Sequence, residues 1–582
     1  MFQSFTKGSR TKKFAIVLSV AMVLFALRLF YIQIIRHEYY VAQADSEQIK
    51  QFVLHAKRGE IYTHDSGNPT ILVMNESVYT VWADPSQVTD KSKVIETLNR
   101  VAGGNTRKDF AQYLDVEATR YQVLATKVSR KQAEMLKKEN LEGIGFDEVT
   151  QRVYPEGQLA SQVLGFVNAE GNGIYGFENA NDEALKGKDG LRKTVTDVRS
   201  VPLTIGSKNV KQPAVDGTDY VLSIDRYVQA RVEKALADGL ARSGATNASA
   251  IVMDPSTGQV MAMANLPTYD PSQLSKISDA ALFNNNVISN PYEPGSDIKT
   301  FTMAAGVDRG VISPESTYNN TDSIRVDDIT ITNANKGHTG NITMQTALNW
   351  SLNTGMVTVA QRLGGSGGTI NRASRDIIYD YFHNRFRMGQ TTGIELANEA
   401  RGTIISPKET QGNAVRYSNM SFGQGMDATM IQVASGFCSI VNGGIYRSPT
   451  IISGTMKDGT FTQASLKQQF PGVISSRASA TVREMVHQSH YATYKPQNTP
   501  EGYFIGGKTG TSQTIENGKY VNNQTIGTYL GFGGEKNKTP RYVIMIEISG
   551  KGKAMGGGTD AKPIFNDISD WMINYLKLQP SE

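Results

Sequence analysis

The sequence predicts an α/β protein of the α+β type, which follows an apolar segment near the amino terminus. Strand-like stretches lie on both sides of a largely helical middle region, an order that suggests one sheet built from both ends and flanked by helices. The chain has 582 residues, too many for one hydrophobic core. We therefore expect several domains.

The apolar segment, residues 14–35, is long enough to span a bilayer. Basic residues precede it, so the positive-inside rule keeps the amino terminus in the cytoplasm. We expect a cytoplasmic tail (residues 1–13), a single-pass anchor in the inner or plasma membrane (residues 14–35) and an extracytoplasmic remainder. A cleaved signal peptide is the alternative, because residues 42–44 resemble a signal-peptidase site, although the apolar stretch is too long for a signal-peptide core.

Residues 36–215 combine short strand-like and helical segments with glycine-containing turns and show no catalytic pattern. We interpret this region as a non-catalytic platform domain. A boundary falls near residues 213–217, and all candidate site residues lie after it, in a domain of residues 216–582.

This second domain begins with a predicted strand at residues 220–224, and Asp225 fits the N-cap position of the next helix. One face of that helix repeats apolar residues at four-residue steps: Val228, Val232, Leu236 and Leu240. Residues 250–253 and 260–263 then form a predicted hairpin around a turn.

Near the carboxyl end, three more strands are predicted at residues 502–511, 528–533 and 542–549. A final helix has an apolar face made of Phe565, Ile568, Trp571, Met572 and Tyr575. Both ends of the domain therefore supply strands to the expected sheet.

Composition argues against several classes of function. The net charge of +5 is small and the basic residues are scattered, which gives nucleic-acid binding no support. The single cysteine, Cys438, excludes an intrachain disulfide and lies in an apolar helical run, where we interpret it as a core residue. The seven histidines show no zinc-ligand spacing. We expect neither a metal nor a cofactor.

A candidate nucleophile, Ser296, follows the chain-breaking residues 293–295 and begins a helical stretch. Free backbone N–H groups at a helix start favour developing negative charge. Lys299 lies one turn later on the same face and can act as the base if its pKa is lowered. Burial and a second cation lower a lysine pKa, and Lys508 is the candidate second cation.

Ser351 and Asn353 form a second candidate pair, after a predicted helix. Ser351 can pass a proton to a leaving group, and Asn353 can hydrogen-bond a substrate amide. The alternative for this pair, taken alone, is a polar helix cap.

The third motif starts at Lys508 and continues through the candidate substrate-binding residues Thr509, Gly510 and Thr511. It lies on a predicted edge strand, where glycines allow a substrate backbone to approach and pair as an added strand. Thr511 can bind a substrate carboxylate, and its N–H with that of Ser296 can form an oxyanion hole. The alternative is an ordinary glycine-rich strand.

In this order and context the three motifs resemble the class B penicillin-binding proteins, monofunctional D,D-transpeptidases of peptidoglycan. Other stretches share the resemblance: residues 58–59, 292–295, 421–425, 442–444 and 556–558. Leu352 replaces the aspartate of the Ser-Asp-Asn form of the middle motif. The resemblance implies a penicillin-binding transpeptidase fold: a five-stranded antiparallel sheet flanked by helices, a helical lobe that carries Ser351, and an elongated α+β platform of the dimerisation type.

The implied reaction is acyl transfer through Ser296, which attacks the penultimate D-alanine carbonyl of a stem peptide. Stem peptides and β-lactams are the implied ligands. A glycosyltransferase-like region is missing before residue 215, so a membrane-embedded glycan polymerase and division proteins are the expected partners. Residues 293–296 favour the septal type, and Arg28 within the anchor is a natural contact surface.

Two alternatives remain open. A β-lactamase or penicillin sensor shares the three motifs, and class A lactamases add a glutamate that activates water. Glu395 is a candidate for that acid, although no supporting motif surrounds it. A non-catalytic division scaffold is the other alternative, which the intact Ser296, Lys299 and Lys508 disfavour.

Overall fold

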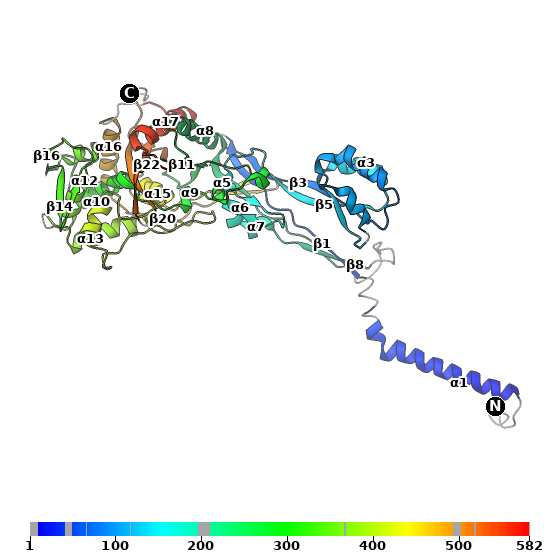
Figure 1. Ribbon diagram of the computed structural model, residues 1–582. Coiled ribbons are helices and arrows are strands. Elements are labelled where there is room, and N and C mark those ends of the chain that lie inside the picture. Colours follow the sequence, from blue (N-terminus) through cyan, green and yellow to red (C-terminus); the bar gives the residue numbers. More distant parts are fainter. Residues whose placement is uncertain are drawn as a thin grey trace. The chain divides into compact units, whose positions relative to one another are not determined.

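The structure is a computed structural model that describes residues 10–40, 43, 49–65, 67–116, 118–195, 210–365, 368–492, 502–516 and 519–580 (Figure 1). It divides into two compact units. The first comprises Met1–Arg58 and Gly187–Gly217, and the second comprises Gly59–Lys186 and Thr218–Glu582. Residues 1–9 of the predicted tail, and most of the possible cleavage site at 42–44, lie outside the described residues.

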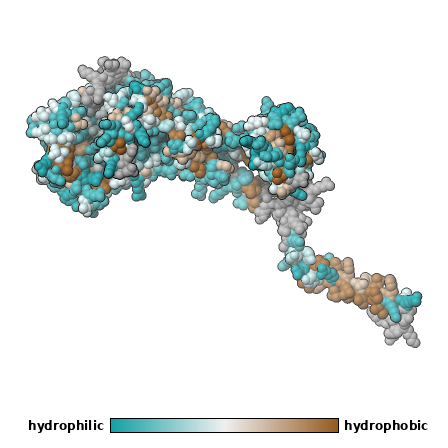
Figure 2. All heavy atoms as spheres, viewed as in Figure 1, coloured by the Kyte–Doolittle hydropathy of each residue, from teal (hydrophilic) through white to brown (hydrophobic). Residues whose placement is uncertain are grey.

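The first unit contains the predicted anchor. Helix α1 (Arg10–Phe30) continues into a π-helical segment, η1 (Tyr31–Ile35), and together they form one apolar helix of 26 residues with mean hydropathy 2.4. None of the most apolar part of this helix is buried, and the helix forms a largely apolar surface in Figure 2. Its length and composition suit either a single-pass anchor or a signal sequence.

The first unit also contains an antiparallel sheet of three strands, in the order β1 (Ile49–Leu54), β8 (Gly190–Val195) and β9 (Val210–Gln212). The domain boundaries inferred from the sequence remain a prediction.

The second unit is built on a five-stranded antiparallel sheet, as predicted. The strand order is β12 (Val260–Leu266), β11 (Asn247–Met253), β23 (Tyr542–Ser549), β22 (Lys519–Gly533) and β21 (Gly506–Glu516). Strands from both ends of the sequence therefore form one sheet. The strand that carries the Lys508 motif, β21, lies at the edge of this sheet, also as predicted.

The predicted strand at residues 220–224 exists as β10 (Asp219–Asp225) but belongs to a different sheet. It pairs in parallel with β2 and antiparallel to β18. Residues 221–224 are all buried, the pattern of a strand covered on both faces rather than of an edge strand. Its sheet contains β19 (Thr460–Gln463), β18 (Ile452–Lys457), β10, β2 (Ile61–Asp65), β3 (Asn68–Ala83), β4 (Gln122–Ser129) and β5 (Ile144–Val153).

Helices cover both faces of the five-stranded sheet (Figure 1). Helix α8 (Arg226–Ser243) and the final helix α17 (Lys562–Tyr575) share one buried core with one face. Asp225 caps α8 as predicted, since its carboxylate accepts hydrogen bonds from the backbone N–H groups of Tyr227 and Val228. Val228, Val232 and Leu236 are buried, and Leu240 is partly buried against the same core.

The other face packs against the larger core, which includes α10 (Lys299–Asp308), α15 (Met430–Val441) and α16 (Ser476–Ala492). Cys438 is buried in α15, and burial raises the pKa of its thiol. It is therefore a core residue, as predicted.

A largely helical lobe follows α10, with β-hairpins at its margin. Its helices are α11 (Met344–Asn349), α12 (Asn353–Leu363), α13 (Arg372–Tyr379) and α14 (Ala414–Met420). Its short strands are β13 (Thr317–Asn320), β14 (Ser323–Val326), β15 (Ile329–Thr332) and β16 (Gly340–Thr343). The lobe holds Ser351 in the turn between α11 and α12.

The segment before β10 adds a separate small core where α3 (Lys91–Ala102) and α4 (Arg130–Lys138) pack near β3 and β4. The remaining short elements include α5 (Ser161–Leu164), β6 (Phe166–Val167), β7 (Gly173–Ile174), α6 (Gly176–Ala180), α7 (Asp182–Lys186), α9 (Asn286–Ser289), β17 (Ile445–Arg447) and β20 (Gln469–Pro471).

Candidate active site

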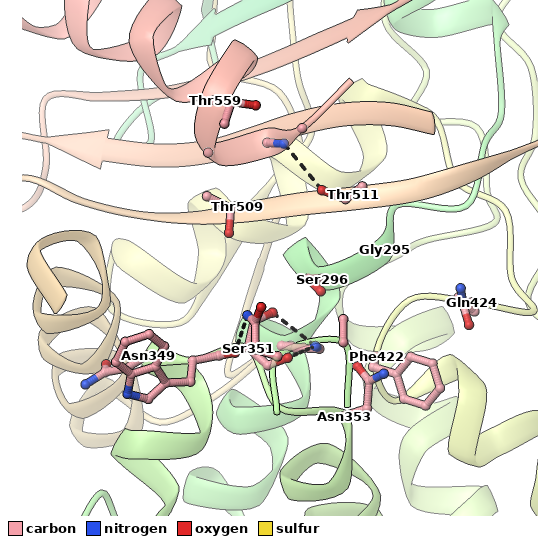
Figure 3. Close-up of a pocket in the computed structure, with 17 residues that line it drawn as sticks. Gly295, Ser296, Asn349, Ser351, Asn353, Phe422, Gln424, Thr509, Thr511 and Thr559 are labelled. Carbon is pink, nitrogen blue, oxygen red and sulfur yellow. Dashed lines mark hydrogen bonds between the residues drawn. The ribbon is translucent and has the colours of Figure 1, made fainter. Parts of the chain in front are cut away.

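A cavity of about 410 Å³ opens between the edge strand β21, the start of α10 and the α11–α12 turn. Six of the eight predicted site residues line it: Ser296, Lys299, Ser351, Asn353, Thr509 and Thr511. Figure 3 shows Ser296 between the strand that carries Thr509 and Thr511 and the turn that carries Ser351. The fold thus brings together three motifs that are spread over more than 200 residues of the sequence.

The candidate nucleophile lies in a 3₁₀ turn, η6 (Gly295–Ile298), which runs directly into α10. The turn starts at Gly295, whose φ of +60° lies in the left-handed region that suits glycine. A Cβ at this position would also lie 2.9 Å from the carbonyl oxygen of Thr511. The predicted helix start at Ser296 is therefore present, with a tighter first turn than an α-helix.

Lys299 is 1% exposed and contacts the second motif. Its Nζ donates to the carbonyl oxygen of Ser351 at 2.6 Å and to Ser351 Oγ at 3.1 Å. Burial, and then the charge of Lys508, hold the pKa of Lys299 well below its usual range. This is the direction expected from the sequence, and it favours the neutral amine that a base requires.

Ser351 connects the two lysines. Its φ of +57° is unusual for a residue other than glycine. In this conformation its hydroxyl lies within hydrogen-bond distance of Lys299 Nζ, and Lys508 Nζ donates to it at 3.0 Å. The strained turn therefore places one hydroxyl between two amines.

Lys508 is 2% exposed and does not itself line the cavity. Its Nζ also donates to the carbonyl oxygen of Thr509 at 2.9 Å and to Thr509 Oγ1 at 3.3 Å. Burial lowers the pKa of Lys508 to about 8, while the nearby Asp297 carboxylate acts in the opposite direction. Lys508 is therefore still mainly a cation at neutral pH.

The remaining predicted substrate-binding residues differ in their positions. Asn353 begins α12, and its Nδ2 donates to the carbonyl oxygen of Thr332 at 2.9 Å. Thr511 is exposed at the cavity, and its Oγ1 accepts from the Gly557 N–H at 3.3 Å. Gly510 is buried and does not line the cavity, because it packs against Thr528 of β22.

Residues 248–570 match the family described as the penicillin binding protein transpeptidase domain, and residues 53–222 match the penicillin-binding protein dimerisation domain. The chain belongs to the class B penicillin-binding proteins. It is a penicillin-binding peptidoglycan D,D-transpeptidase, and its transpeptidase domain implies binding of peptides and β-lactams.

Known class B penicillin-binding proteins are similar to this chain over nearly its whole length. Stage V sporulation protein D of Bacillus subtilis is 29% identical over 98% of this chain and 86% of its own length. Peptidoglycan D,D-transpeptidase FtsI of Escherichia coli K12 is 27% identical over 95% of this chain and 89% of its own length. The crystal structure of a peptidoglycan synthetase from Bifidobacterium adolescentis shares the fold, with a TM-score of 0.71, 23% identity and coverage of 92% of this chain and 98% of that one.

One buried charge of this class B penicillin-binding protein was not predicted from the sequence. Asp297 is 0% exposed, and its Oδ2 accepts a hydrogen bond from Thr528 Oγ1 at 2.7 Å. Burial raises the pKa of Asp297 to about 7, against the opposing effects of Thr528 and Lys508. The available signal is a carboxylate placed between the nucleophile and the base.

Several residues that line the cavity are not indicated by any of the three short motifs. They are Ala334, Asn335, Asn349, Trp350, Phe422, Gln424 and the loop residues 556–559. Asn349 and Trp350 directly precede Ser351, and the others come from segments distant in the sequence that the tertiary fold brings to the cavity. In the sequence, the stretches 421–425 and 556–558 are marked only by their resemblance to the family.

Glu395, the candidate water-activating acid, does not line the cavity. Its carboxylate accepts hydrogen bonds from Thr450 Oγ1 and the Ile451 N–H and pairs with Lys467 Nζ at 2.6 Å. Glu395 therefore has a structural role that supports the start of β18. Among the residues that the structure describes, no group of three His, Cys, Asp or Glu side chains is arranged to hold a metal.

Proposed function

We propose that the chain is a membrane-anchored serine D,D-transpeptidase that cross-links stem peptides through an acyl-enzyme on Ser296. The observation that carries this proposal is the pair of lysines around Ser351, beside a serine that faces the cavity. Lys299 is buried and favours its neutral form, whereas Lys508 remains charged. One amine can therefore act as a base while the other holds an anion.

In the acylation step, neutral Lys299 takes the proton of Ser296 Oγ as this oxygen attacks the penultimate D-alanine carbonyl. The N–H groups of Ser296 and Thr511 stabilise the oxyanion. The proton passes through Ser351 to the amine of the departing D-alanine. Thr509 and Thr511, which line the cavity, bind the substrate carboxylate, and the positive charge of Lys508 behind them favours this anion.

In the second step an amine of a neighbouring stem peptide attacks the acyl-enzyme ester. The same base accepts the amine proton, and Ser296 leaves with a proton returned from Lys299, which completes the cross-link. A β-lactam acylates Ser296 by the first step, but its leaving amine stays attached to the adduct. We propose that this adduct hydrolyses slowly.

Transfer of an acyl group to an amine tests this proposal. The purified chain should release D-alanine from a stem peptide that ends in D-Ala-D-Ala and join the rest to an added amine, and Ser296→Ala should do neither. The lifetime of a penicillin adduct separates the alternatives: a β-lactamase would free itself within seconds, and a non-catalytic scaffold would form no adduct. Either outcome would refute the proposed transpeptidase.

We further propose that α1 and η1 anchor the enzyme in the membrane and that residues 36–215 form its platform. The apolar helix of 26 residues supports the anchor. The match of residues 53–222 to the dimerisation domain supports the platform. The remaining residues, 216–582, would form the catalytic domain.

The proposed cellular role is septal, with a membrane-embedded glycan polymerase and division proteins as partners. Residues 293–296 support the septal type, and the relative FtsI is also a D,D-transpeptidase. The similarity to a protein named for stage V of sporulation favours a second role, in spore formation. Depletion should give cells that elongate without dividing. Swollen, rounded cells would assign the enzyme to lateral growth, and a defect confined to spores would support the second role.

A further inference from the structure

Asp297 follows the nucleophile in the sequence, yet its carboxylate faces away from the cavity. It does not line the cavity, and its Oδ2 instead accepts from Thr528 Oγ1 at 2.7 Å. Thr528 lies on β22, directly opposite Gly510 of β21. The hydrogen bond therefore joins the turn that carries the nucleophile, η6, to β22, the strand next to the edge strand β21.

Gly510 provides the space for this connection. A Cβ at position 510 would lie 2.1 Å from Thr528 Oγ1 and 2.9 Å from Asp297 Oδ2, both closer than real Cβ contacts. Any residue larger than glycine at position 510 would therefore displace the hydrogen bond between Thr528 and Asp297. The glycine of the third motif is therefore explained by the buried carboxylate as well as by access for a substrate.

This connection lies next to both N–H groups of the proposed oxyanion hole. Asp297 is bonded to Ser296 along the chain, and Gly510 is bonded to Thr511. The hydrogen bond behind β21 therefore limits how far the Ser296 and Thr511 N–H groups can move apart. Oxyanion stabilisation depends on such spacing, because the donors act at about 2.7–3.1 Å from the developing charge.

We propose that Asp297 is a positioning residue, which fixes the spacing of the two oxyanion N–H groups and supplies the counter-charge of Lys508. This inference rests on the acyl-enzyme mechanism proposed above. Asp297 Oδ1 has no hydrogen-bond donor among the described residues, so its charge is not neutralised locally. Lys508 and Gly510 are two residues apart on β21 and therefore point to the same face of the strand, where a Cβ at position 510 would lie 2.9 Å from Asp297 Oδ2. Lys508 is thus the cation on the Asp297 side of the strand, and the two charges act on each other.

The other titratable groups around Asp297 come from several elements. Tyr292 precedes the nucleophile turn and Tyr529 lies on β22, and burial holds the pKa of both phenols well above the usual range. Glu547 of β23 lies directly opposite Thr528, and burial raises its pKa to about 7. Lys299 of α10 favours its neutral form. At mildly alkaline pH both carboxylates are ionised, and Asp297 is the one whose charge acts on Lys508.

The pH dependence of acylation tests this proposal. The second-order rate of acylation by a fluorescent penicillin is measured from pH 6 to pH 10 for the full chain and for Asp297→Asn. The asparagine keeps the size of the side chain but removes its charge. Since the carboxylate raises the pKa of Lys508, the alkaline fall in rate should begin about one pH unit lower in the variant.

Two variants of Thr528 separate spacing from charge. Thr528→Val removes the hydroxyl and keeps the carboxylate, so the rate should fall about tenfold, less than the ~10²–10³-fold loss of an entire oxyanion donor. Thr528→Ser keeps the hydroxyl and should restore the rate. The Thr528 hydrogen bond lowers the pKa of Asp297, so the rates of these variants are compared on the alkaline side of the profile, where the carboxylate is ionised. The variants keep the Asp297 side chain, so they test the proposal even if Asp297→Asn does not fold.

Glu547→Gln is the matched control, since it removes a buried carboxylate from the same region of the sheet. Its alkaline limb should coincide with that of the unmodified chain. The proposal is overturned if Asp297→Asn lowers the rate without moving the limb, if Glu547→Gln moves it equally, or if Thr528→Val keeps the full rate. A failure of the acyl-enzyme mechanism is recognised separately, because Ser296→Ala would then remain labelled.

Discussion

Replacing Gly510 by alanine should slow acylation strongly and also lower the stability of the fold. The added Cβ would lie 2.1 Å from Thr528 Oγ1 and 2.9 Å from Asp297 Oδ2, so some group must move. Because β21 is an edge strand held by β22, the least constrained response is an outward shift of β21 toward the cavity. That shift moves the Thr511 N–H away from Ser296.

The magnitude follows from these contacts. Overpacking costs about 1–3 kcal/mol, and the loss of a buried hydrogen bond to a charged group adds about 1.5–3 kcal/mol. Displacing one oxyanion donor lowers the rate by about 10²–10³-fold. We therefore expect Gly510→Ala to fold, with a lower midpoint of urea unfolding, and to be acylated at least about 100-fold more slowly.

The assay is the second-order rate of labelling by a fluorescent penicillin, measured together with urea unfolding. Gly103→Ala is the control, since a Cβ at Gly103 meets no atom within 4 Å. It should leave both quantities unchanged. A labelling rate for Gly510→Ala within threefold of the unmodified chain would refute the reasoning.

Three further predictions concern the base, a buried acid and the anchor. Lys299→Ala should fold but be acylated about 10²–10⁴-fold more slowly, and near-normal acylation by a penicillin would disprove the lysine base. Burial raises the pKa of Glu547 to about 7, so its contribution to the free energy of unfolding is complete below about pH 4.5 and is lost as the pH rises through 7. Glu547→Gln should therefore gain up to about 3 kcal/mol relative to the unmodified chain between pH 5 and pH 8 in urea titrations, and a constant difference would contradict the buried acid. Deleting residues 1–36 should give a soluble chain that still binds penicillin in a gel assay, and loss of binding would contradict the proposed independence of anchor and site.

Local patterns in the sequence predicted much of the site. The break at Gly295 predicted the helix start at Ser296, and the glycine-rich stretch at Lys508 predicted an edge strand. The lowered pKa of Lys299 followed from the expected burial and from a second lysine nearby. In each of these cases, the physical cause lies within a few residues or in the order of the motifs.

Other features depend on contacts that no short pattern indicates. The strand β10 joins the sheet of β2 and β18 rather than the five-stranded sheet. Its buried residues 221–224 suit a central strand of either sheet, so the sequence pattern does not distinguish between the two. The left-handed conformation of Ser351 follows from the turn between α11 and α12. The position of Asp297 behind β21 requires Gly510 and Thr528, which are more than 200 residues away in the sequence.

The identity of the acylated residue is the most direct test of the account. The chain is labelled with a penicillin, digested, and sequenced by tandem mass spectrometry. We predict one adduct, on the peptide that contains Ser296, and no adduct in Ser296→Ala. An adduct on Ser351 or another serine, or unchanged labelling of Ser296→Ala, would contradict the assignment of Ser296 as the nucleophile.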